Sequence, residues 1–265
     1  MVEMAASRGA DAIVFDLEDS VPQSEKDNAR ELVRQTLADW PADSATMRYV
    51  RINPPRMSMI DEDTAVFDSN ENIGIVVPKV DRPVELEPVF QRVGRFARDV
   101  IVNIETPRSI MHMESFADTH GVGGLFLGGE DLSESMGMRR TNESQELQIP
   151  RFLLLAACRA AGIGAYDTVC PEFRDLDIVE NDARTASSMG YDGKFAIHPA
   201  QVEPIHAAFT PSADEVEHAH RVVEAYDDAV AQGRGAVEVG GKMIDPPVAE
   251  RARALLARSG TLSKS

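Results

Sequence analysis

Two acidic residues directly follow apolar runs that have the composition of buried β-strands. Glu105 closes the run IVNIE, and Asp131 follows the run LFLGG. Because the two runs are consecutive, we expect both carboxylates at the same edge of a parallel sheet. Two carboxylates with room for water suit Mg²⁺, which prefers oxygen ligands and retains several waters. The alternative is that one carboxylate caps a helix and the other is solvent-exposed.

A basic residue, Arg51, lies within the strand-like run YVRIN. An Arg that faces a barrel interior must pair with a carboxylate or an anionic ligand, because an unpaired buried charge is costly. We therefore interpret Arg51 as a clamp for a substrate carboxylate or an oxyanion. The alternative is a structural salt bridge to Glu18 or Asp19, which follow another strand-like run.

Two consecutive glycines, Gly128 and Gly129, precede Glu130 and Asp131. Glycine lets the backbone approach a ligand closely, and free amides at this point could hold a carboxylate. We predict that Gly128, Gly129 and Glu130 contribute to substrate binding. The alternative is an ordinary turn, which most Gly-Gly pairs form.

The elements that must position these residues are short β-branched runs that alternate with longer amphipathic segments. This alternation predicts βαβ units and a parallel sheet. The runs are almost continuously apolar, which indicates strands that are covered on both faces. The expected strands are Ala12–Asp16, Met47–Asn53, Ile73–Val80, Val100–Thr106, Gly124–Gly128, Ile163–Thr168 and Gly193–His198. The expected helices are Ser24–Leu37, Pro83–Arg98, Ser109–Ala117, Ile149–Ala161 and Leu176–Met189.

Seven strands are one fewer than a (β/α)8 barrel contains. The opening residues, MVEMAASRG, have the pattern of a helix that ends at Gly9. A helix in front of a strand is what a missing first strand would leave. We therefore predict an α/β fold of the TIM type, a (β/α)8 barrel without its first strand, over residues 1–209. The alternative is that the natural start of the chain lies upstream of Met1.

The pattern changes in the last part of the chain. A helix is expected over residues 210–232, with Pro211 at its first position. The Gly-rich stretch Gly233–Gly241 has the Val alternation of a short hairpin, and a last helix is expected over Pro247–Arg258. We predict that residues 210–265 form a C-terminal helical extension that acts as a lid or as an oligomerisation segment.

Composition excludes several classes of function. The 265 residues include 44 acidic and 27 basic side chains, for a net charge of −17. Such a surface repels phosphate backbones, which argues against nucleic-acid binding. The longest apolar stretch is too short to span a bilayer, so no membrane association is expected. The N-terminus does not resemble a signal peptide, and the two cysteines lack paired spacing, so we expect a cytoplasmic protein.

The motifs, in this order, resemble those of the citrate lyase β-subunit-like and malyl-CoA lyase family, within the HpcH/HpaI aldolase superfamily of Mg²⁺-dependent barrels. The resemblance covers almost the whole chain. It rests on GADAIVFDLEDSVPQSEKDNAR (9–30), VRIN (50–53), VVPKV (76–80), IETPRSI (104–110), LGGEDLS (127–133), FAIHPAQV (195–202) and GKMIDPPVAERA (241–252). The family's first strand, an Arg-Ser-x-Leu-like run, has no counterpart in this sequence.

The resemblance implies roles for individual residues. Glu105 and Asp131 match the family's metal-binding Glu and Asp. Arg51 matches the Arg that contacts the thioester or enolate oxygen. Glu18 and Asp19 match the acidic pair near the metal waters, and we place Glu18 with Arg51 among the catalytic residues.

A further catalytic residue is implied in the C-terminal segment. Asp245, in KMIDPP, matches the acid/base Asp, which in relatives reaches into the active site of a neighbouring subunit. The resemblance therefore also implies a homo-oligomer, a trimer or a hexamer.

The activity that the resemblance implies is that of a Mg²⁺-dependent carbon–carbon lyase. Its substrate would be a 3-hydroxyacyl-CoA, such as malyl-, methylmalyl-, citramalyl- or citryl-CoA, and its products a 2-oxo acid and an acyl-CoA. One alternative is a malyl-CoA thioesterase on the same fold. Another is an aldolase for free 2-oxo acids, against which KMIDPP argues. The last is an inactive paralogue or structural subunit, against which the intact set of Glu105, Asp131, Arg51 and Asp245 argues.

Overall fold

The structure, a computed structural model, describes residues 9–41, 44–67, 73–93 and 97–262. The predicted N-terminal helix therefore lies outside the described residues, except for Gly9 and its positive φ of 81°. The chain divides into two compact units, Met1–Ile205 and His206–Ser265. Each unit is described by itself.

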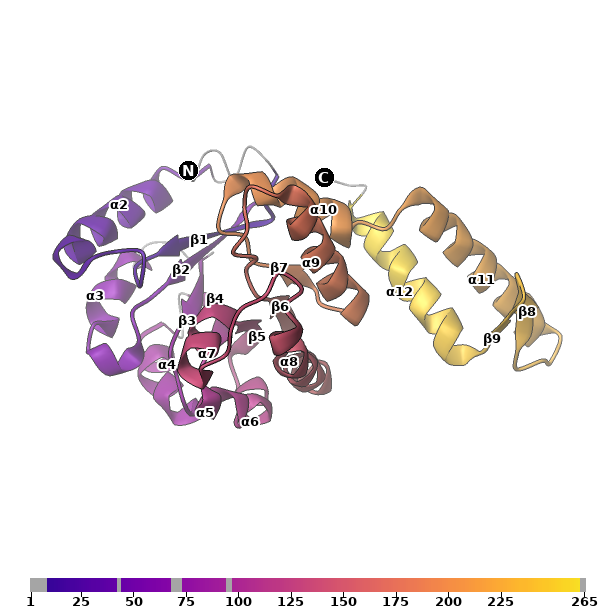
Figure 1. Cartoon of the computed structure of the whole chain (residues 1–265), viewed down its shortest axis with the longest axis horizontal. Coiled ribbons are helices and arrows are strands. Elements are labelled where there is room, and N and C mark those ends of the chain that lie inside the picture. Colours follow the sequence, from indigo (N-terminus) through magenta and orange to yellow (C-terminus); the bar gives the residue numbers. More distant parts are fainter. Residues whose placement is uncertain (1–8, 42–43, 68–72, 94–96, 263–265) are drawn as a thin grey trace. The chain divides into compact units, whose positions relative to one another are not determined.

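The first unit is built on a seven-stranded parallel sheet whose strand order follows the chain order. Helices surround the strands (Figure 1). This arrangement confirms a TIM-like α/β fold. Within the described residues, β1 and β7 are the two edges of the sheet. The strands are β1 (Ala12–Asp16), β2 (Met47–Arg51), β3 (Ile73–Val77), β4 (Ala97–Ile104), β5 (Val122–Leu127), β6 (Gly164–Asp167) and β7 (Gly193–Lys194).

The helices of this unit follow the strands. The longer ones have one buried face and one exposed face, as expected for the outer layer of such a fold. They are α2 (Lys26–Ala38), α3 (Ile60–Thr64), α4 (Glu87–Val93), α5 (Pro107–Ile110), α6 (Met113–Ala117), α7 (Gly129–Met136), α8 (Gln148–Ala161) and α9 (Leu176–Met189). A further helix, α10 (Val202–Phe209), spans the boundary between the two units.

Several predicted elements differ in extent from the structure, and two of them differ clearly. The helix predicted over Pro83–Arg98 is a 3-10 turn followed by α4, and it ends at Val93 because β4 begins at Ala97 and pairs with β3. The strand predicted over Gly193–His198 keeps only its first two residues. His198 instead caps the next helical turn, where its Nδ1 accepts from the Ala200 N–H at 3.1 Å.

The core inside the curled sheet explains why polar residues reach its rim. Tyr49, Val76, Ile101 and Phe126 form one buried cluster on the same face of four neighbouring strands. Side chains alternate between the two faces of a strand, so every second residue shares a face. Arg51 lies two residues after Tyr49, and Glu105, directly after β4, lies four residues after Ile101. Burial of each large apolar side chain contributes about 1.5–3 kcal/mol to the stability of the fold. The packed apolar layer therefore determines where the charged residues next to it lie.

A buried ionic network holds the last strands to their helices. Arg151 of α8 pairs with Asp167 of β6 at 2.8 Å and with Asp182 of α9 at 2.7 Å. Lys194 of β7 pairs with the same two carboxylates at 2.7 and 2.6 Å. Two cations and two anions compensate one another, which is what burial of charged groups requires.

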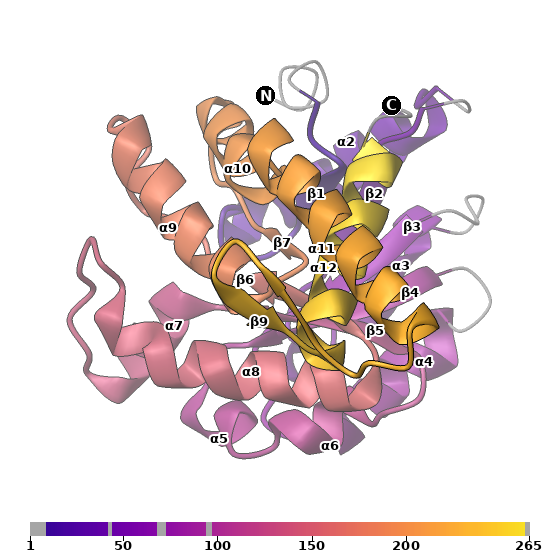
Figure 2. The ribbon, with the colours of Figure 1, turned by 90° about the vertical axis from the view of Figure 1, so that its right-hand side faces the viewer.

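The second unit is a helical hairpin with a small β-hairpin. It consists of α11 (Ala213–Ala231), β8 (Val237–Val239), β9 (Lys242–Ile244) and α12 (Pro246–Leu262). The two helices pack side by side (Figures 1 and 2). Its core contains Val222, Tyr226, Ile244 and Ala249.

The second unit differs in detail from the prediction, and its last helix, α12, is longer than the predicted Pro247–Arg258. Its first helix begins at Ala213 rather than at Pro211, because Ser212 caps it and accepts from the Glu215 N–H at 3.2 Å. The hairpin turn lies at Gly240 and Gly241, whose φ angles of 58° and 78° suit the turn type that joins two antiparallel strands tightly. Among the described residues, no helix has the length and apolar character needed to cross a membrane.

Candidate active site

Glu105 directly follows β4, and it is buried, with 2% exposed. One oxygen accepts from the Lys79 backbone N–H at 2.6 Å, and the other accepts from the side-chain amide of Asn103. Burial and the nearby charge of Asp131 raise the pKa of Glu105 to about 8. The carboxylate is therefore neither a helix cap nor solvent-exposed.

Asp131 stands in the first turn of α7, whose N-cap residue is Gly128. Its side chain makes no capping hydrogen bond there and remains partly exposed. One of its oxygens lies 3.6 Å from the Lys79 ammonium. Because Asp131 contributes to the raised pKa of Glu105, the two carboxylates are close enough to repel each other, and a cation between them would relieve that repulsion.

The two glycines are used differently from the sequence prediction. The N–H of Gly128 donates to the Ile104 carbonyl at 3.0 Å, and that of Gly129 donates to the Thr168 hydroxyl at 3.1 Å. The prediction that these two amides are free for a substrate carboxylate is therefore wrong. Gly128 is required for space instead, since a Cβ there would lie 2.5 Å from the Cβ of Glu105.

Glu130 also has a partner within the protein. Its carboxylate accepts from the Arg140 guanidinium at 2.7 Å at an exposed position. Its backbone amide, like that of Asp131, belongs to the first turn of α7, where N–H groups have no acceptor within the helix. The backbone amides that could bind an anion are therefore those of Glu130 and Asp131 rather than those of Gly128 and Gly129.

Arg51 is held by two carboxylates. Its Nε and one terminal nitrogen donate to both oxygens of Asp16 at 2.7 and 2.6 Å. The other terminal nitrogen lies 3.1 Å from Glu18. The predicted pairing alternatives were Glu18 and Asp19, so the sequence interpretation included Glu18 and missed Asp16. These three contacts engage three of the five N–H groups of a guanidinium, which leaves donors for an anionic ligand.

Lys79 is the site residue to which the sequence interpretation assigned no role. It follows β3, and its ammonium lies 2.7 Å from Glu18 and 2.6 Å from Asp19. Burial lowers the pKa of Lys79, but the hydrogen bonds from its ammonium to Asp19 and Glu18 outweigh burial and raise it. The available signal was a basic residue shortly after a buried strand in VVPKV, whereas Arg51 was identified within its strand.

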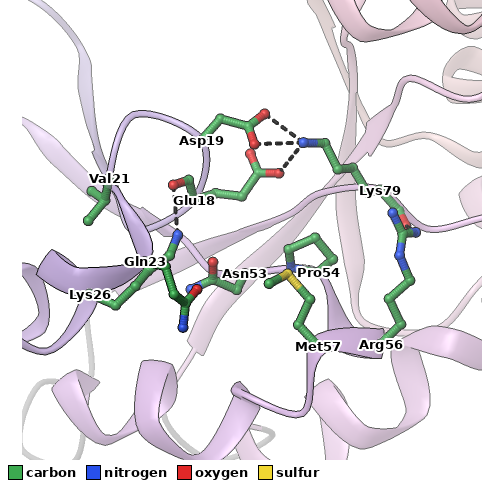
Figure 3. A pocket seen from close by; sticks show the side chains of 10 residues that line it. All are labelled: Glu18, Asp19, Val21, Gln23, Lys26, Asn53, Pro54, Arg56, Met57 and Lys79. Carbon is green, nitrogen blue, oxygen red and sulfur yellow. Dashed lines mark hydrogen bonds and ion pairs between the residues drawn. The ribbon is translucent and has the colours of Figure 1, made fainter.

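A pocket of about 320 Å³ opens beside this cluster (Figure 3). Glu18, Asp19 and Lys79 line one side, and the ammonium of Lys79 points toward the two carboxylates. Pro54 and Met57 line another part and give the pocket an apolar surface. An acidic cluster therefore adjoins a space that can take a small ligand with both polar and apolar parts.

The donor set suits Mg²⁺ more than it suits a cation that needs a full protein cage. Among the described residues, no three His, Cys, Asp or Glu side chains converge as a set of metal ligands. Mg²⁺ typically takes one or two carboxylates, keeps several waters and contacts its substrate. Glu105 and Asp131, with Glu18 and Asp19 nearby, fit that pattern.

The sequence matches the model of the HpcH/HpaI aldolase/citrate lyase family over residues 1–199. The chain belongs to this family. It is 33% identical over 264 residues to a (3S)-malyl-CoA thioesterase of Cereibacter sphaeroides, covering 99% of this chain and 91% of that protein. It is 34% identical over 265 residues to citrate lyase subunit beta of Haemophilus influenzae, covering 94% and 89%.

A solved structure of the family is similar over nearly the whole chain. CitE from Mycobacterium tuberculosis, in complex with magnesium, acetoacetate and coenzyme A, has a TM-score of 0.81 and 27% identity. The match covers 97% of this chain and 95% of that chain. The predicted citrate lyase β-subunit-like membership of the HpcH/HpaI aldolase group is thereby confirmed.

In this member of the HpcH/HpaI aldolase/citrate lyase family, Asp245 lies in the second unit. It directly precedes α12, and its side chain accepts from the Val248 N–H at 3.2 Å. Asp245 therefore helps to cap that helix. The other predicted site residues, apart from the exposed Glu130 carboxylate, gather at the carboxyl ends of β1 to β5.

Proposed function

We propose that this protein is a Mg²⁺-dependent carbon–carbon lyase that acts on a 3-hydroxyacyl-CoA of the malyl, methylmalyl, citramalyl or citryl type. Glu105 and Asp131 would hold the Mg²⁺. The relatives support this proposal, since they include a citrate lyase subunit and a family structure that contains magnesium and coenzyme A. The observation that carries it is the convergence of Arg51 and the carboxylates Glu18, Glu105 and Asp131 at one rim of the sheet.

The reaction transfers electrons from one carbon–carbon bond to the thioester. The bond between C2 and the carbinol carbon breaks, the hydroxyl proton leaves, and the carbinol becomes the ketone of a 2-oxo acid. The bonding electrons form the enolate of the acyl-CoA, which then takes up one proton at carbon. Mg²⁺, when bound, supplies a Lewis acid for the oxygen that becomes the ketone.

Arg51 is the residue suited to stabilise the enolate. Asp16 and Glu18 fix its guanidinium plane, so the remaining N–H groups have a defined direction. A preorganised donor of this kind stabilises negative charge that develops in the transition state. The thioester oxygen gains that charge as the carbon–carbon bond breaks, so we place it against Arg51.

Three groups would complete the site. The amides of Glu130 and Asp131 would receive the carboxylate of the 2-oxo acid, because both lie at the N-terminal turn of α7. The pocket beside Lys79 would accept part of the thioester arm along Pro54 and Met57. Asp245 of a neighbouring subunit in a homo-oligomer would take up the hydroxyl proton and deliver a proton to the enolate carbon.

Product analysis tests the proposed reaction. Malyl-CoA and its methyl and citryl relatives would be incubated with the protein and Mg²⁺, and the products separated by chromatography. A 2-oxo acid and an acyl-CoA are expected. Free CoA together with the intact hydroxy acid would instead show a thioesterase, the second candidate. That candidate is favoured by the 33% identity to (3S)-malyl-CoA thioesterase over 99% of this chain.

The metal assignment has its own test. Glu105→Gln removes a carboxylate charge but keeps the shape of the side chain, and we expect it to abolish Mg²⁺-dependent turnover and Mg²⁺ binding by calorimetry. Glu134→Gln is the matched control, since Glu134 is exposed on the same helix as Asp131. Full Mg²⁺ binding by Glu105→Gln would show that the assignment is wrong.

A further inference from the structure

Lys79 contacts four carboxylates of the candidate site, those of Glu18, Asp19, Glu105 and Asp131. Its backbone N–H donates to Glu105 at 2.6 Å. Its ammonium lies 2.7 Å from Glu18 and 2.6 Å from Asp19 (Figure 3). It also lies 3.6 Å from Asp131. One residue thus orients one proposed metal carboxylate through its backbone and approaches the other through its side chain.

The backbone of Lys79 adopts a conformation that it would not choose by itself. Its φ is 52°, in the left-handed region that side chains other than glycine rarely adopt. The conformation is held on both sides, because the N–H donates to Glu105 and the carbonyl accepts from Arg56 at 2.6 Å. Such a conformation persists when the surrounding contacts determine it, and it is found preferentially at functional sites.

The ammonium provides a permanent positive charge among acids. Its side chain is 21% exposed, so its interactions are only partly screened by water. The ammonium neutralises part of the charge on Glu18 and Asp19 and fixes the direction of both carboxylates. It also lies close to Asp131, and it therefore repels any divalent cation that binds Asp131.

We propose that Lys79 is a positioning residue that holds the Glu18–Asp19 pair in its working orientation and, as a consequence, weakens the binding of the divalent cation. The inference rests on the proposed Mg²⁺ site. It makes opposite predictions for two quantities. Removal of the ammonium releases two carboxylates and removes a repelling charge, so cation affinity rises. Turnover falls, because the acidic pair loses its fixed orientation. A merely structural lysine would lower both.

The test compares the full-length wild type with Lys79→Met, Lys79→Arg and Lys79→Gly. Mn²⁺ binding is measured by electron paramagnetic resonance and Mg²⁺ binding by calorimetry, both without substrate. We expect Lys79→Met and Lys79→Gly to bind either cation about tenfold more tightly, the effect of removing one nearby charge. Lys79→Arg should keep the wild-type affinity. The glycine variant also relieves the left-handed backbone, so it guards against a misfolded methionine variant.

Arg92→Met is the control, because it removes an exposed cation whose ion pair with Asp61 lies on the surface. It should leave affinity unchanged. Equal or weaker cation binding by both Lys79→Met and Lys79→Gly would overturn the inference. A wild-type protein that binds neither Mg²⁺ nor Mn²⁺ would instead overturn the proposed function. Where turnover is observed, it should drop at least tenfold in Lys79→Met while the cation binds more tightly.

Discussion

Asp16 and Arg51 are register partners on the neighbouring strands β1 and β2, and their side chains form a two-point ion pair of 2.7 and 2.6 Å. The strand register places Asp16 beside Arg51, so the same pairing that aligns the strands also orients the guanidinium. Asp16 further accepts from the Glu18 N–H at 2.9 Å and thereby shapes the loop that carries the acidic pair.

The stability contribution of Asp16 should depend on pH. Burial raises its pKa, but the hydrogen bonds and charge of Arg51 outweigh burial and lower the pKa from 3.8 to about 2. A lowered folded-state pKa stabilises the protein above the unfolded pKa, and that contribution is lost as pH falls from about 4 through 2. We expect Asp16→Asn to cost about 2 kcal/mol at pH 6 and progressively less toward pH 2, measured by urea denaturation. Asp39→Asn, at an exposed position, is the control. A pH-independent cost would contradict this account.

Arg51→Lys should impair turnover although it preserves the charge. Lysine cannot reproduce the two-point contact with Asp16 and has no planar fork to direct at the thioester. Loss of one preorganised oxyanion donor typically lowers kcat by about 10²–10³-fold, and we expect a reduction of that size with a smaller change in KM. Steady-state kinetics with the active thioester measures both. Wild-type kcat in Arg51→Lys would show that Arg51 is only a structural partner of Asp16.

Gly128→Ala should damage the site without removing a charged group. The added methyl would lie 2.6 Å from Asn103 Oδ1 and from one Glu105 oxygen, so both side chains must move. We expect Mg²⁺ affinity to fall at least tenfold in calorimetry, since a displaced ligand costs more than about 1.4 kcal/mol. Gly235→Ala, where a methyl would meet open space, is the matched control. Unchanged Mg²⁺ binding in Gly128→Ala would show that Glu105 is not a ligand of the metal.

Arg151→Met should be strongly destabilising. It removes one cation from a network in which Arg151, Asp167 and Lys194 are almost fully buried, and it leaves excess negative charge. Breaking a buried pair costs about 3–5 kcal/mol. Arg159→Met is the control, because the Arg159–Asp192 pair is 45% exposed on both sides and such pairs contribute about 0–1 kcal/mol. Chemical denaturation of the two variants gives the comparison, and similar costs would contradict the buried-network interpretation.

The sequence predicts the helices and strands of this fold better than it predicts the contacts within the site. Ala12–Asp16 and Leu176–Met189 have the predicted bounds, because local hydrophobic patterns and helix ends determine them. Glu105 and Arg51 were identifiable because Glu105 closes an apolar run and Arg51 lies within a strand-like one. Arg98, by contrast, extended a helical pattern into β4, where pairing with β3 decides the conformation.

The partners of these charges could not be read from local patterns. Arg51 chooses Asp16 because the parallel register places the two side by side, and the sequence alone does not contain that register. Lys79 was overlooked for a similar reason. Its role depends on a left-handed backbone that local sequence disfavours and that Glu105 and Arg56 impose from elsewhere in the fold.

The balance of charge at the rim has a consequence for the order of events in a catalytic cycle. Five carboxylates lie at this rim, and two cations, Arg51 and Lys79, form ion pairs with members of that group: Asp16, Glu18, Asp19, Glu105 and Asp131. An anionic acid that arrives before the divalent cation meets net repulsion, whereas one that arrives afterwards meets a partly neutralised surface. For the proposed Mg²⁺-dependent reaction, we therefore expect the cation to bind first and the acid to leave before it.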